Sequence, residues 1–588
     1  MREPGSSPQT DRDLTSIAEA RALAQRAKRA WLELAEFSQD RIDAVVDAMA
    51  QAATEQAEAF ARLAVEETGY GVVAHKIQKN LFASQKVYNF IRPMKTVGVV
   101  ARHDDTRVVE IAEPFGVVAA VVPSTNPTST AIYKILISVK ARCAIVMSPH
   151  PSAVKCITRV ADVMNQAARR AGAPEGVINW MTTVTLEGTQ ELMKHRDVAV
   201  ILATGGMGLV RAAYSAGKPA YGVGPGNAPA YIERTANVKK AVRDVITGKT
   251  FDNGVLCSSE NSVVVDESIA EDVKRELAGQ GAYFMNKAET DAVARVLVTP
   301  QRLPNPVLVG KAATVIAAKC GITVPPETTV LIAPLEGVGR DYPLSIEKLC
   351  PVLSFYVVRD WREGCERCKQ ILRYGGMGHT MSIHSQDEQV ILEFGLKKPA
   401  FRIVVNTPAT HGSIGLTTGL DPAMTLGCGG YGGNITSDNI SPRHLLNIKR
   451  LAYEISPATS RFERAGAAQT DRAAAGAIEV PLASASSSGN ALPGGITAEA
   501  LSAQIDQFLG RRGYRPEGTR QAANAADLRP SSARTPDQAP LEFVCEDDVR
   551  VAIQAGRMLV VSERAIVTPA ARDLGEQHHV FSIAPWRG

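Results

Sequence analysis

The sequence predicts an α/β protein organised around a doubly wound parallel sheet. Two observations carry this prediction. Residues 116–122 form a continuous apolar run, as strands do when both faces of a parallel sheet are covered. From there to about residue 216, strand-like and helix-like segments alternate, which is the pattern of βαβ units. Expected strands are 116–122, 144–147, 177–181 and 198–203, and expected helices are 130–142, 152–171, 187–194 and 210–216.

Composition excludes several classes of protein. The chain has 588 residues, of which 45% are hydrophobic and 21% charged, as in a globular protein. Its net charge of +4 is too small for this length to indicate a nucleic-acid-binding surface. No apolar run reaches the roughly 18 residues of a membrane span, and the polar N-terminus has no secretory h-region. We therefore expect a cytoplasmic protein without membrane or nucleic-acid partners. The nine cysteines follow no disulfide pattern, and the lone pair Cys365 and Cys368 lies in a helix-like segment, so we expect no metal site.

The segments before the first buried strand have two characters. Residues 1–13 are polar and expected to be disordered, whereas residues 14–92 repeat apolar positions at helical spacing and predict several amphipathic helices. Two β-like runs, 97–101 and 107–111, flank a polar turn and predict a hairpin. Because an exposed hairpin must pair its edges, a partner subunit is one expected neighbour.

A glycine-rich helix start follows the strand that ends at Ala203. Thr204, Gly205, Gly206 and Met207 are compact enough to leave the backbone N–H groups of a helix N-terminus open to a phosphate. The pattern lacks the full GxGxxG spacing, so a plain tight turn explains it equally well on local grounds.

One cysteine lies in a polar turn at the start of a second α/β region, residues 250–435. The stretch FDNGVLCSSEN places Cys257 after turn-forming residues and before the β-branched run 263–265. A thiol in such a loop can ionise and act as a nucleophile. A buried structural cysteine is the alternative that the local sequence leaves open.

The composition changes near residue 459. Residues 459–495 and 511–541 are rich in small and polar residues and predict linkers on either side of an amphipathic helix, 496–510. A lone helix of this length is marginal in water, so its apolar face either docks into a partner or packs back on the body. Residues 542–588 predict a helix–strand–helix module that is too small for a core of its own.

Seven segments, in one order, resemble the aldehyde dehydrogenase superfamily. They are EPFGVVAAVVPSTNPTST, AGAPEGVINW, LATGGMGLVRAA, GVGPGNAPAYI, FDNGVLCSSEN, EKLCPVLSFY and YGGMGHTMSIHS. The resemblance covers residues 14–456 and is closest to the branch that makes acyl-CoA from aldehydes such as acetaldehyde and propionaldehyde. It implies a Rossmann-type NAD-binding domain over 14–249 with an oligomerisation hairpin at 97–111. A catalytic cysteine domain over 250–435 and a return segment over 436–458 complete the implied fold.

The resemblance also assigns catalytic roles. Cys257 corresponds to the nucleophile that forms a thioester, and Asn126 to the side chain that stabilises the oxyanion. Without the family, Asn126 between two prolines is an ordinary turn residue. Hydrolytic members carry a glutamate in an E-L-G-G-K stretch that activates water, and Gly222 stands at that position here. The missing carboxylate favours transfer of the acyl group to coenzyme A over release of a free acid.

Cofactor residues are implied in the same way. Thr204, Gly205, Gly206 and Met207 correspond to the pyrophosphate site, and Glu347 to the carboxylate that binds the nicotinamide ribose, although a surface charge is its alternative. The remaining expected residues are Pro123, Pro149 and His150 near NAD, with His379 and Gly222 beside the acyl or CoA channel. His379 is equally well a core histidine. The lysine that the family usually has near the adenosine end of the cofactor is missing, so the choice between NAD and NADP stays open.

The tail resembles the encapsulation peptides of enzymes loaded into bacterial microcompartments. The resemblance implies a location inside such a compartment, with a shell protein bound through residues 496–509. The hairpin at 97–111 separately suggests a homodimer or dimer of dimers. Two alternatives stay open: a hydrolytic NAD(P)-dependent aldehyde dehydrogenase that gives a free acid, and a catalytically vestigial shell-binding scaffold.

Overall fold

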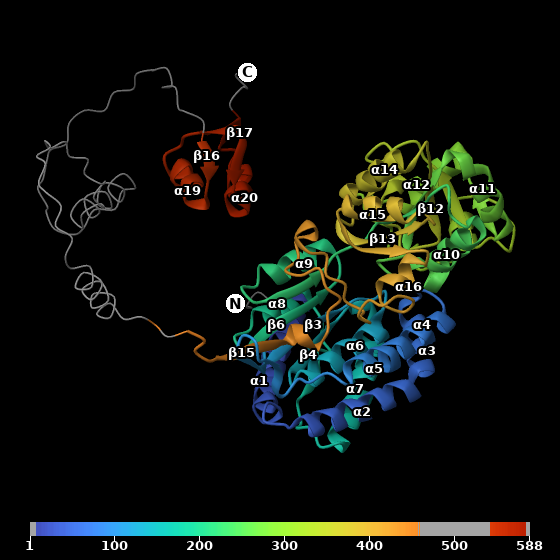
Figure 1. Ribbon diagram of the computed structural model, residues 1–588. Coiled ribbons are helices and arrows are strands. Elements are labelled where there is room, and N and C mark those ends of the chain that lie inside the picture. Colours follow the sequence, from blue (N-terminus) through green and yellow to red (C-terminus); the bar gives the residue numbers. More distant parts are fainter. Residues whose placement is uncertain (1–7, 457, 459–540, 584–588) are drawn as a thin grey trace, which may run out of the picture. The chain divides into compact units, whose positions relative to one another are not determined.

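The computed structural model describes residues 8–456, 458 and 541–583 (Figure 1). By its internal contacts the chain divides into two units, residues 1–466 and 467–588. The predicted helix at 496–510 and both predicted linkers lie outside the described residues, except Leu541, which the prediction placed in the second linker and which begins a strand of the second unit.

Helices form the first layer of the large unit. They are α1 (Pro8–Leu34), α2 (Gln39–Glu55), α3 (Ala57–Thr68) and α4 (Val73–Leu81), which continues through a π-helical turn (Phe82–Val87) into α5 (Tyr88–Ile91). The expected disorder of residues 1–13 is wrong from Pro8 onward. The helix extends this far because α1 packs along α8 (Leu186–Lys194), where Ser16 Oγ donates to Thr183 O at 2.6 Å.

The first sheet is parallel and doubly wound, as predicted. Its order is β5 (Ile178–Trp180), β4 (Ala144–Pro149), β3 (Val117–Val122), β6 (Val198–Thr204) and β7 (Ala220–Val223). Its helices are α6 (Pro127–Lys140), α7 (Val154–Arg170), α8 and α9 (Met207–Tyr214). The winding reverses between β3 and β6, where such sheets bind ligands at the carboxyl ends of their strands. Lys134 spans this point by donating to Val121 O and Leu202 O at 2.7 and 2.9 Å.

The second sheet has seven parallel strands. Their order is β10 (Ala282–Phe284), β11 (Val330–Pro334), β12 (Val352–Val358), β9 (Glu260–Asp266), β8 (Ala228–Ile232), β13 (Gly378–His384) and β14 (Ala400–Val405). Its helices are α10 (Val238–Thr250), α11 (Ala270–Gly279), α12 (Lys287–Leu297), α13 (Ala313–Lys319), α14 (Trp361–Tyr374), α15 (Glu388–Leu396) and α16 (Ala409–Ser413).

Both expected boundaries of the catalytic domain need correction. Because β8 and α10 belong to the second sheet, the first domain ends after β7, near residue 224, rather than at residue 249. At the other end, Ile414, Ala423 and Leu426 are buried in the core beneath the first sheet, so the chain has returned to that domain before residue 435.

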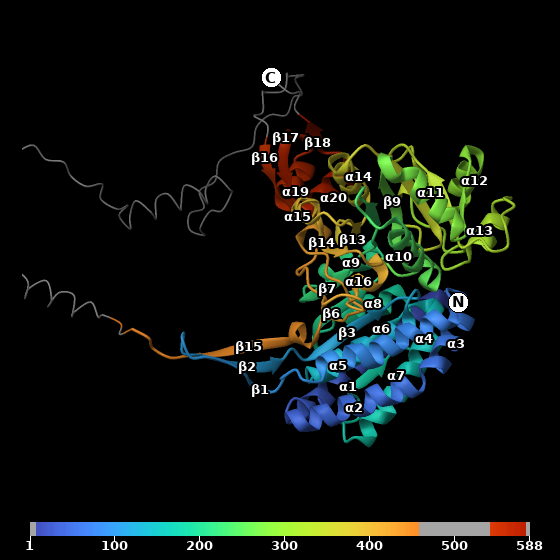
Figure 2. The same ribbon diagram turned by 45° about the vertical axis from the view of Figure 1, so that its right-hand side comes forward.

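A third, antiparallel sheet carries the predicted hairpin. β1 (Gly98–His103) pairs with β2 (Val108–Pro114), and β15 (Leu446–Ala452) pairs with the other side of β2. Figure 2 shows the three strands side by side, extending from the helical layer. The role of this sheet in oligomerisation stays a prediction.

The second unit has more structure than the sequence predicted. Its described part runs β16 (Leu541–Val544), α19 (Glu546–Gln554), β17 (Leu559–Val567), α20 (Pro569–Gln577) and β18 (Phe581–Ile583), with three parallel strands in that order. The prediction missed both edge strands. The expectation that the module lacks a core is also wrong, because Val544, Val549, Ala552 and Leu559 are buried together in a small apolar cluster.

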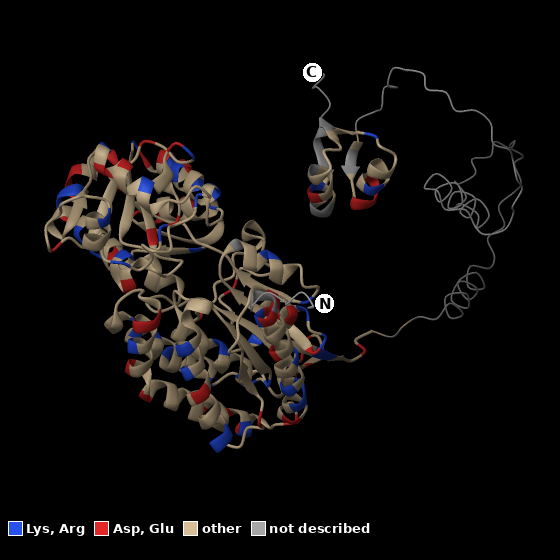
Figure 3. Ribbon diagram, turned by 180° about the vertical axis from the view of Figure 1, so that it is seen from behind, with Lys and Arg blue, Asp and Glu red and all other residues tan. Residues whose placement is uncertain are grey.

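Charges of both signs are distributed over the described surface. Figure 3 shows Lys and Arg interspersed with Asp and Glu on the helices of both sheets. Among the described residues, no helix combines the length and the apolar character that crossing a bilayer requires.

Candidate active site

A cavity of about 490 Å³ lies where the carboxyl ends of β3, β4, β6 and β7 meet the segments that lead into β9 and β12. This volume is in the usual range for a small-molecule site. The predicted residues that line it are Pro123, Asn126, Pro149, His150, Thr204, Gly205, Gly206, Cys257 and Glu347. Gly222 and His379 are not among the described residues that line it. The fold therefore brings nine of the twelve predicted residues to one cavity, and their roles remain predictions.

The turn before Cys257 has an unusual backbone. Asp252, Asn253 and Gly254 have φ values of 52°, 54° and 72°, all in the left-handed region. Two consecutive residues with side chains in this region cost free energy, so the surroundings must hold them there. The His75 ring nitrogen accepts the Asp252 N–H at 2.9 Å, and the Asn253 amide donates to Gly310 O at 2.9 Å.

The Asp252 carboxylate is the centre of a buried charge cluster. It accepts the Val72 N–H at 2.7 Å and ion pairs with the ammonium groups of Lys76, at 3.0 Å, and Lys79, all three side chains being nearly inaccessible. Burial lowers the Lys79 pKa to about 7, and the two lysines lower the pKa of Asp252 despite its burial. This cluster fastens the turn before Cys257 to α4.

Lys79 also connects the cluster to the predicted oxyanion residue. Its Nζ donates to Asn126 Oδ1 at 2.6 Å. Because the oxygen end of the amide is held by a cation, the NH₂ end has a defined orientation and remains a donor. Asn126 occupies the position just before α6, whose first residue, Pro127, starts the helix earlier than the predicted Thr130 because proline is well tolerated at that position.

The segment that joins the first parallel sheet to the second lies next to Cys257. Residues 224–227 join β7 to β8, and the Gly226 N–H donates to Glu347 Oε1 at 3.0 Å. A Cβ on Gly226 would lie 2.0 Å from the Cys257 carbonyl oxygen. Only glycine fits at this contact.

His379 contacts the sulfur itself, although its role as a channel residue stays a prediction. Its Nε2 lies 3.2 Å from Cys257 Sγ and its Nδ1 lies 3.0 Å from Thr380 Oγ1. Burial lowers the His379 pKa to about 3, and burial followed by the nearby Glu347 charge raises the Cys257 pKa to about 12. The resting pair is therefore neutral thiol and neutral imidazole. The Arg402 charge opposes the rise in the Cys257 pKa without outweighing burial, and the role of Cys257 as a nucleophile stays a prediction.

No carboxylate in the site is prepared to act as a base at neutral pH. Gly222 has no room for a side chain, since a Cβ there would lie 2.8 Å from Val210 and 3.0 Å from the Tyr214 ring. Glu347 does face the cavity, but burial raises its pKa to about 8. It is therefore mostly protonated at pH 7.

The end of the cavity near Thr204 and Gly206 has polar groups without protein partners, which a nicotinamide dinucleotide could use. Thr204 Oγ1 is inaccessible to solvent and has no hydrogen-bond partner within the described residues. A Cβ on Gly206, which precedes α9, would meet nothing within 4 Å, so ligand atoms can approach this helix start. The residues that line this end of the cavity therefore fit a dinucleotide phosphate. Met207 begins α9.

Sequence reasoning missed Lys76, Lys79 and the structural part played by Asp252. The only signal was the spacing of the two lysines, which places them three residues apart on one face of a helix. Such a pair usually lies in solvent, and nothing local indicates that both are buried.

Comparison with known proteins agrees with this geometry. The profile of the aldehyde dehydrogenase family matches residues 7–293. The chain is 44% identical over 444 residues to the bifunctional aldehyde-alcohol dehydrogenase AdhE of Escherichia coli, covering 75% of this chain and 50% of that protein. It is 37% identical over 431 residues to the succinate-semialdehyde dehydrogenase (acetylating) of Clostridium kluyveri, covering 73% of this chain and 95% of that protein. The chain thus belongs to the aldehyde dehydrogenase family, and it spans about half the length of the bifunctional relatives.

Solved structures extend the comparison. An acetylating aldehyde dehydrogenase from Geobacillus thermoglucosidasius is 52% identical with a TM-score of 0.75, over 76% of this chain and 99% of that one. A propionaldehyde dehydrogenase from the fucose utilisation microcompartment of Clostridium phytofermentans is 28% identical, with a TM-score of 0.68. The match covers 75% of this chain and 99% of that one. A propionaldehyde dehydrogenase of Rhodopseudomonas palustris, solved with bound CoA and an acylated cysteine, is 26% identical, with a TM-score of 0.67. The match covers 74% of this chain and 97% of that one.

The charge cluster predicts a large effect of Asp252→Asn. Two buried ammonium groups would lose their carboxylate, so the free energy of unfolding should fall by about 3–5 kcal/mol at pH 7. Because the folded pKa of Asp252 is lowered, the difference from wild type should shrink as the pH falls below about 4. Calorimetry or denaturant unfolding measures it, with Asp291→Asn, which breaks an exposed pair, as the control. Equal small effects of both variants would contradict a buried cluster.

The raised Cys257 pKa predicts slow alkylation of the free enzyme. Iodoacetamide modification of the Cys257 peptide, followed by mass spectrometry, should speed up about tenfold per pH unit from pH 7 to 9, because only the small thiolate fraction reacts. A rate that is already maximal at pH 7 would instead indicate a preformed thiolate.

Proposed function

We propose that the chain is an NAD-dependent, CoA-acylating aldehyde dehydrogenase that acts on a short aldehyde of the acetaldehyde or propionaldehyde type. One observation carries the choice of product. Gly222 supplies no carboxylate, and Glu347, the one carboxyl group among the described residues that line the cavity, is mostly protonated at pH 7, which disfavours the activation of water against an acyl group on Cys257. The acetylating relative and the CoA-bound neighbour support the same choice.

In the first half-reaction, Cys257 Sγ attacks the aldehyde carbon while its proton leaves toward His379 Nε2. The tautomer that donates from Nδ1 to Thr380 Oγ1 leaves Nε2 free to accept this proton. Asn126 Nδ2, oriented through Lys79, and the Cys257 backbone N–H would stabilise the resulting oxyanion. Bound at Thr204, Gly205 and Gly206, the nicotinamide dinucleotide supplies the hydride acceptor.

In the second half-reaction, the acyl group is held on Cys257 as a thioester. Coenzyme A is a thiol, and its sulfur is a better nucleophile toward a thioester than neutral water. After hydride transfer, His379 would release the first proton to solvent; it lies beside the acylated sulfur and would then take the proton of the incoming thiol and return it to the departing Cys257 sulfur. Acyl-CoA then leaves and Cys257 returns to the thiol form. The described residues that line the cavity include no lysine or arginine, and this favours NAD, because a 2′-phosphate is usually bound by a cationic side chain.

An omission assay tests the acyl acceptor. With propionaldehyde and NAD, NADH formation should depend on CoA and stop after about one turnover without it, because hydrolysis of the thioester is slow. Cys257→Ala should lower kcat by at least about 10³-fold, since the nucleophile is lost. Steady NADH production without CoA would favour the hydrolytic alternative. A chain that is inactive with every aldehyde would favour a vestigial scaffold.

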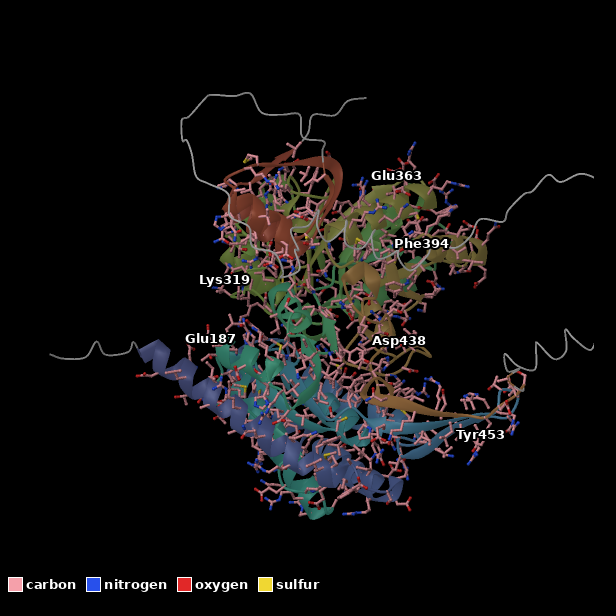
Figure 4. All side chains as sticks on the ribbon, turned by 90° about the vertical axis from the view of Figure 1, so that its left-hand side faces the viewer. Glu187, Lys319, Glu363, Phe394, Asp438 and Tyr453 are labelled. Atoms are coloured by element: carbon pink, nitrogen blue, oxygen red, sulfur yellow. The ribbon has the colours of Figure 1, made fainter. Side chains whose placement is uncertain are left out.

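We propose further that the chain forms a homodimer or dimer of dimers through the β1–β2–β15 sheet. Leu451 near the end of β15, and Tyr453 and Ile455 in the segment directly after it, are 51%, 55% and 71% exposed (Figure 4 labels Tyr453). An edge strand with exposed apolar side chains is suited to a second copy.

Leu451→Asp combined with Ile455→Asp should therefore shift the native mass toward the monomer in light scattering, because the charges would be buried at the interface. Leu396→Asp, at a 72% exposed position on α15, serves as the control and should leave the mass unchanged. An unchanged oligomer in the double variant would place the interface elsewhere.

We also propose that residues 496–509 deliver the enzyme to a bacterial microcompartment by binding a shell protein. The amphipathic pattern of this segment and the microcompartment origin of one structural neighbour support the proposal.

Deleting residues 460–588 should leave catalysis within about twofold of wild type, because the active site lies wholly within the first unit, and should abolish co-purification with shells. Deleting only residues 541–588 distinguishes a targeting role of residues 496–509 from one of the terminal module, because this variant keeps the first segment and lacks the second. A truncated enzyme that still co-purifies with shells would refute the targeting role.

A further inference from the structure

A lysine and a cysteine meet in the second sheet's helical layer, away from the active-site cavity. Lys398 Nζ lies 2.6 Å from Cys365 Sγ. Cys365 is on α14 and only 2% exposed, and Lys398, just after α15, is 7% exposed. This separation is shorter than an N–H···S hydrogen bond between unbonded atoms. It corresponds to the spacing that ordinary single bonds give a nitrogen and a sulfur joined through one oxygen atom.

Lys398 is enclosed by neutral groups. No described ion pair includes it, and its nitrogen lies 3.3 Å from the centroid of the Phe394 ring and 3.4 Å from Phe394 O. Burial lowers its pKa, so its amine loses a proton more readily than that of an exposed lysine. Figure 4 labels Phe394 on α15 and Glu363 on the neighbouring α14. The neutral amine is the form that can bond to an oxidised sulfur at this distance.

We propose that Cys365 and Lys398 form a reversible covalent nitrogen–oxygen–sulfur bridge when the enzyme meets a peroxide. The first peroxide molecule oxidises the Cys365 thiol to a sulfenic acid, forming the S–O bond and releasing one water. The second removes one hydrogen from the sulfenic O–H and one from the Lys398 amine, forming the O–N bond and releasing two waters. Two equivalents of a dithiol supply the four electrons that return thiol, amine and one water.

The bridge would connect two elements behind the catalytic histidine. Lys398 precedes Pro399, whose carbonyl accepts the Gly378 N–H at 2.7 Å. Gly378 pairs with Ala400 in the register of β13 and β14 and directly precedes His379. A bond from Lys398 to α14 therefore restrains the end of the strand that carries His379. The site is separate from the proposed chemistry at Cys257, and it does not depend on that proposal.

Peptide mapping of the full-length enzyme tests the bridge. The protein is treated with hydrogen peroxide, free thiols are blocked with iodoacetamide, and tryptic peptides are analysed by mass spectrometry. Trypsin cleaves after Arg367 and so separates Cys365 from Cys368. We expect the Cys365 peptide joined to the Lys398 peptide with one added oxygen and two lost hydrogens, and its disappearance after dithiothreitol.

Matched variants make the result specific. Lys398→Met should abolish the cross-linked peptide, whereas Lys397→Met, at the adjacent exposed lysine, should retain it. Cys368→Ser should also retain it, and this variant keeps the test valid if Lys398→Met fails to fold. A disulfide between Cys365 and Cys368, a Cys365 that ends only as sulfinic acid, or a Cys365 that stays fully alkylated would each overturn the proposal.

Discussion

The buried ion pairs of Asp252 with Lys76 and Lys79 are the interaction on which the geometry of the site depends. They hold a left-handed turn in place, fix the loop that carries Cys257 against α4, and through Lys79 orient the Asn126 amide. A buried cluster of this kind contributes little net stability but defines one arrangement, because removal of any member leaves an uncompensated charge. Nucleophile and oxyanion donor are therefore positioned by one set of contacts.

The electrostatics of the site keep its ionisable groups neutral. Cys257 and His379 are both neutral at pH 7, since burial raises the pKa of the first and lowers that of the second. In the proposed mechanism, proton transfer between them would accompany attack on a carbonyl rather than precede it. Burial also raises the pKa of Glu347 to about 8, so that most of this carboxyl group is protonated at neutral pH.

Much of the fold and part of the site could be predicted from the residues. The alternation after Gly116 identifies the first sheet, and the turn-forming residues before Cys257 place that thiol in a loop. The boundary at residue 249 was placed too late, because no local pattern shows that the strand 228–232 pairs within the second sheet. The contacts of Lys79 with Asn126, and of His379 with Cys257, join residues 47 and 122 positions apart. Local patterns carry no information about such pairs, so only the tertiary structure reveals them.

The link through Gly226 couples the two parallel sheets at the Cys257 loop. Four residues carry the backbone from the first sheet to the second, and a Cβ at Gly226 would lie 2.0 Å from the carbonyl oxygen of Cys257. Any larger residue at this position would push the linker and the cysteine loop apart. A rotation of one sheet relative to the other about these residues would therefore also displace Cys257.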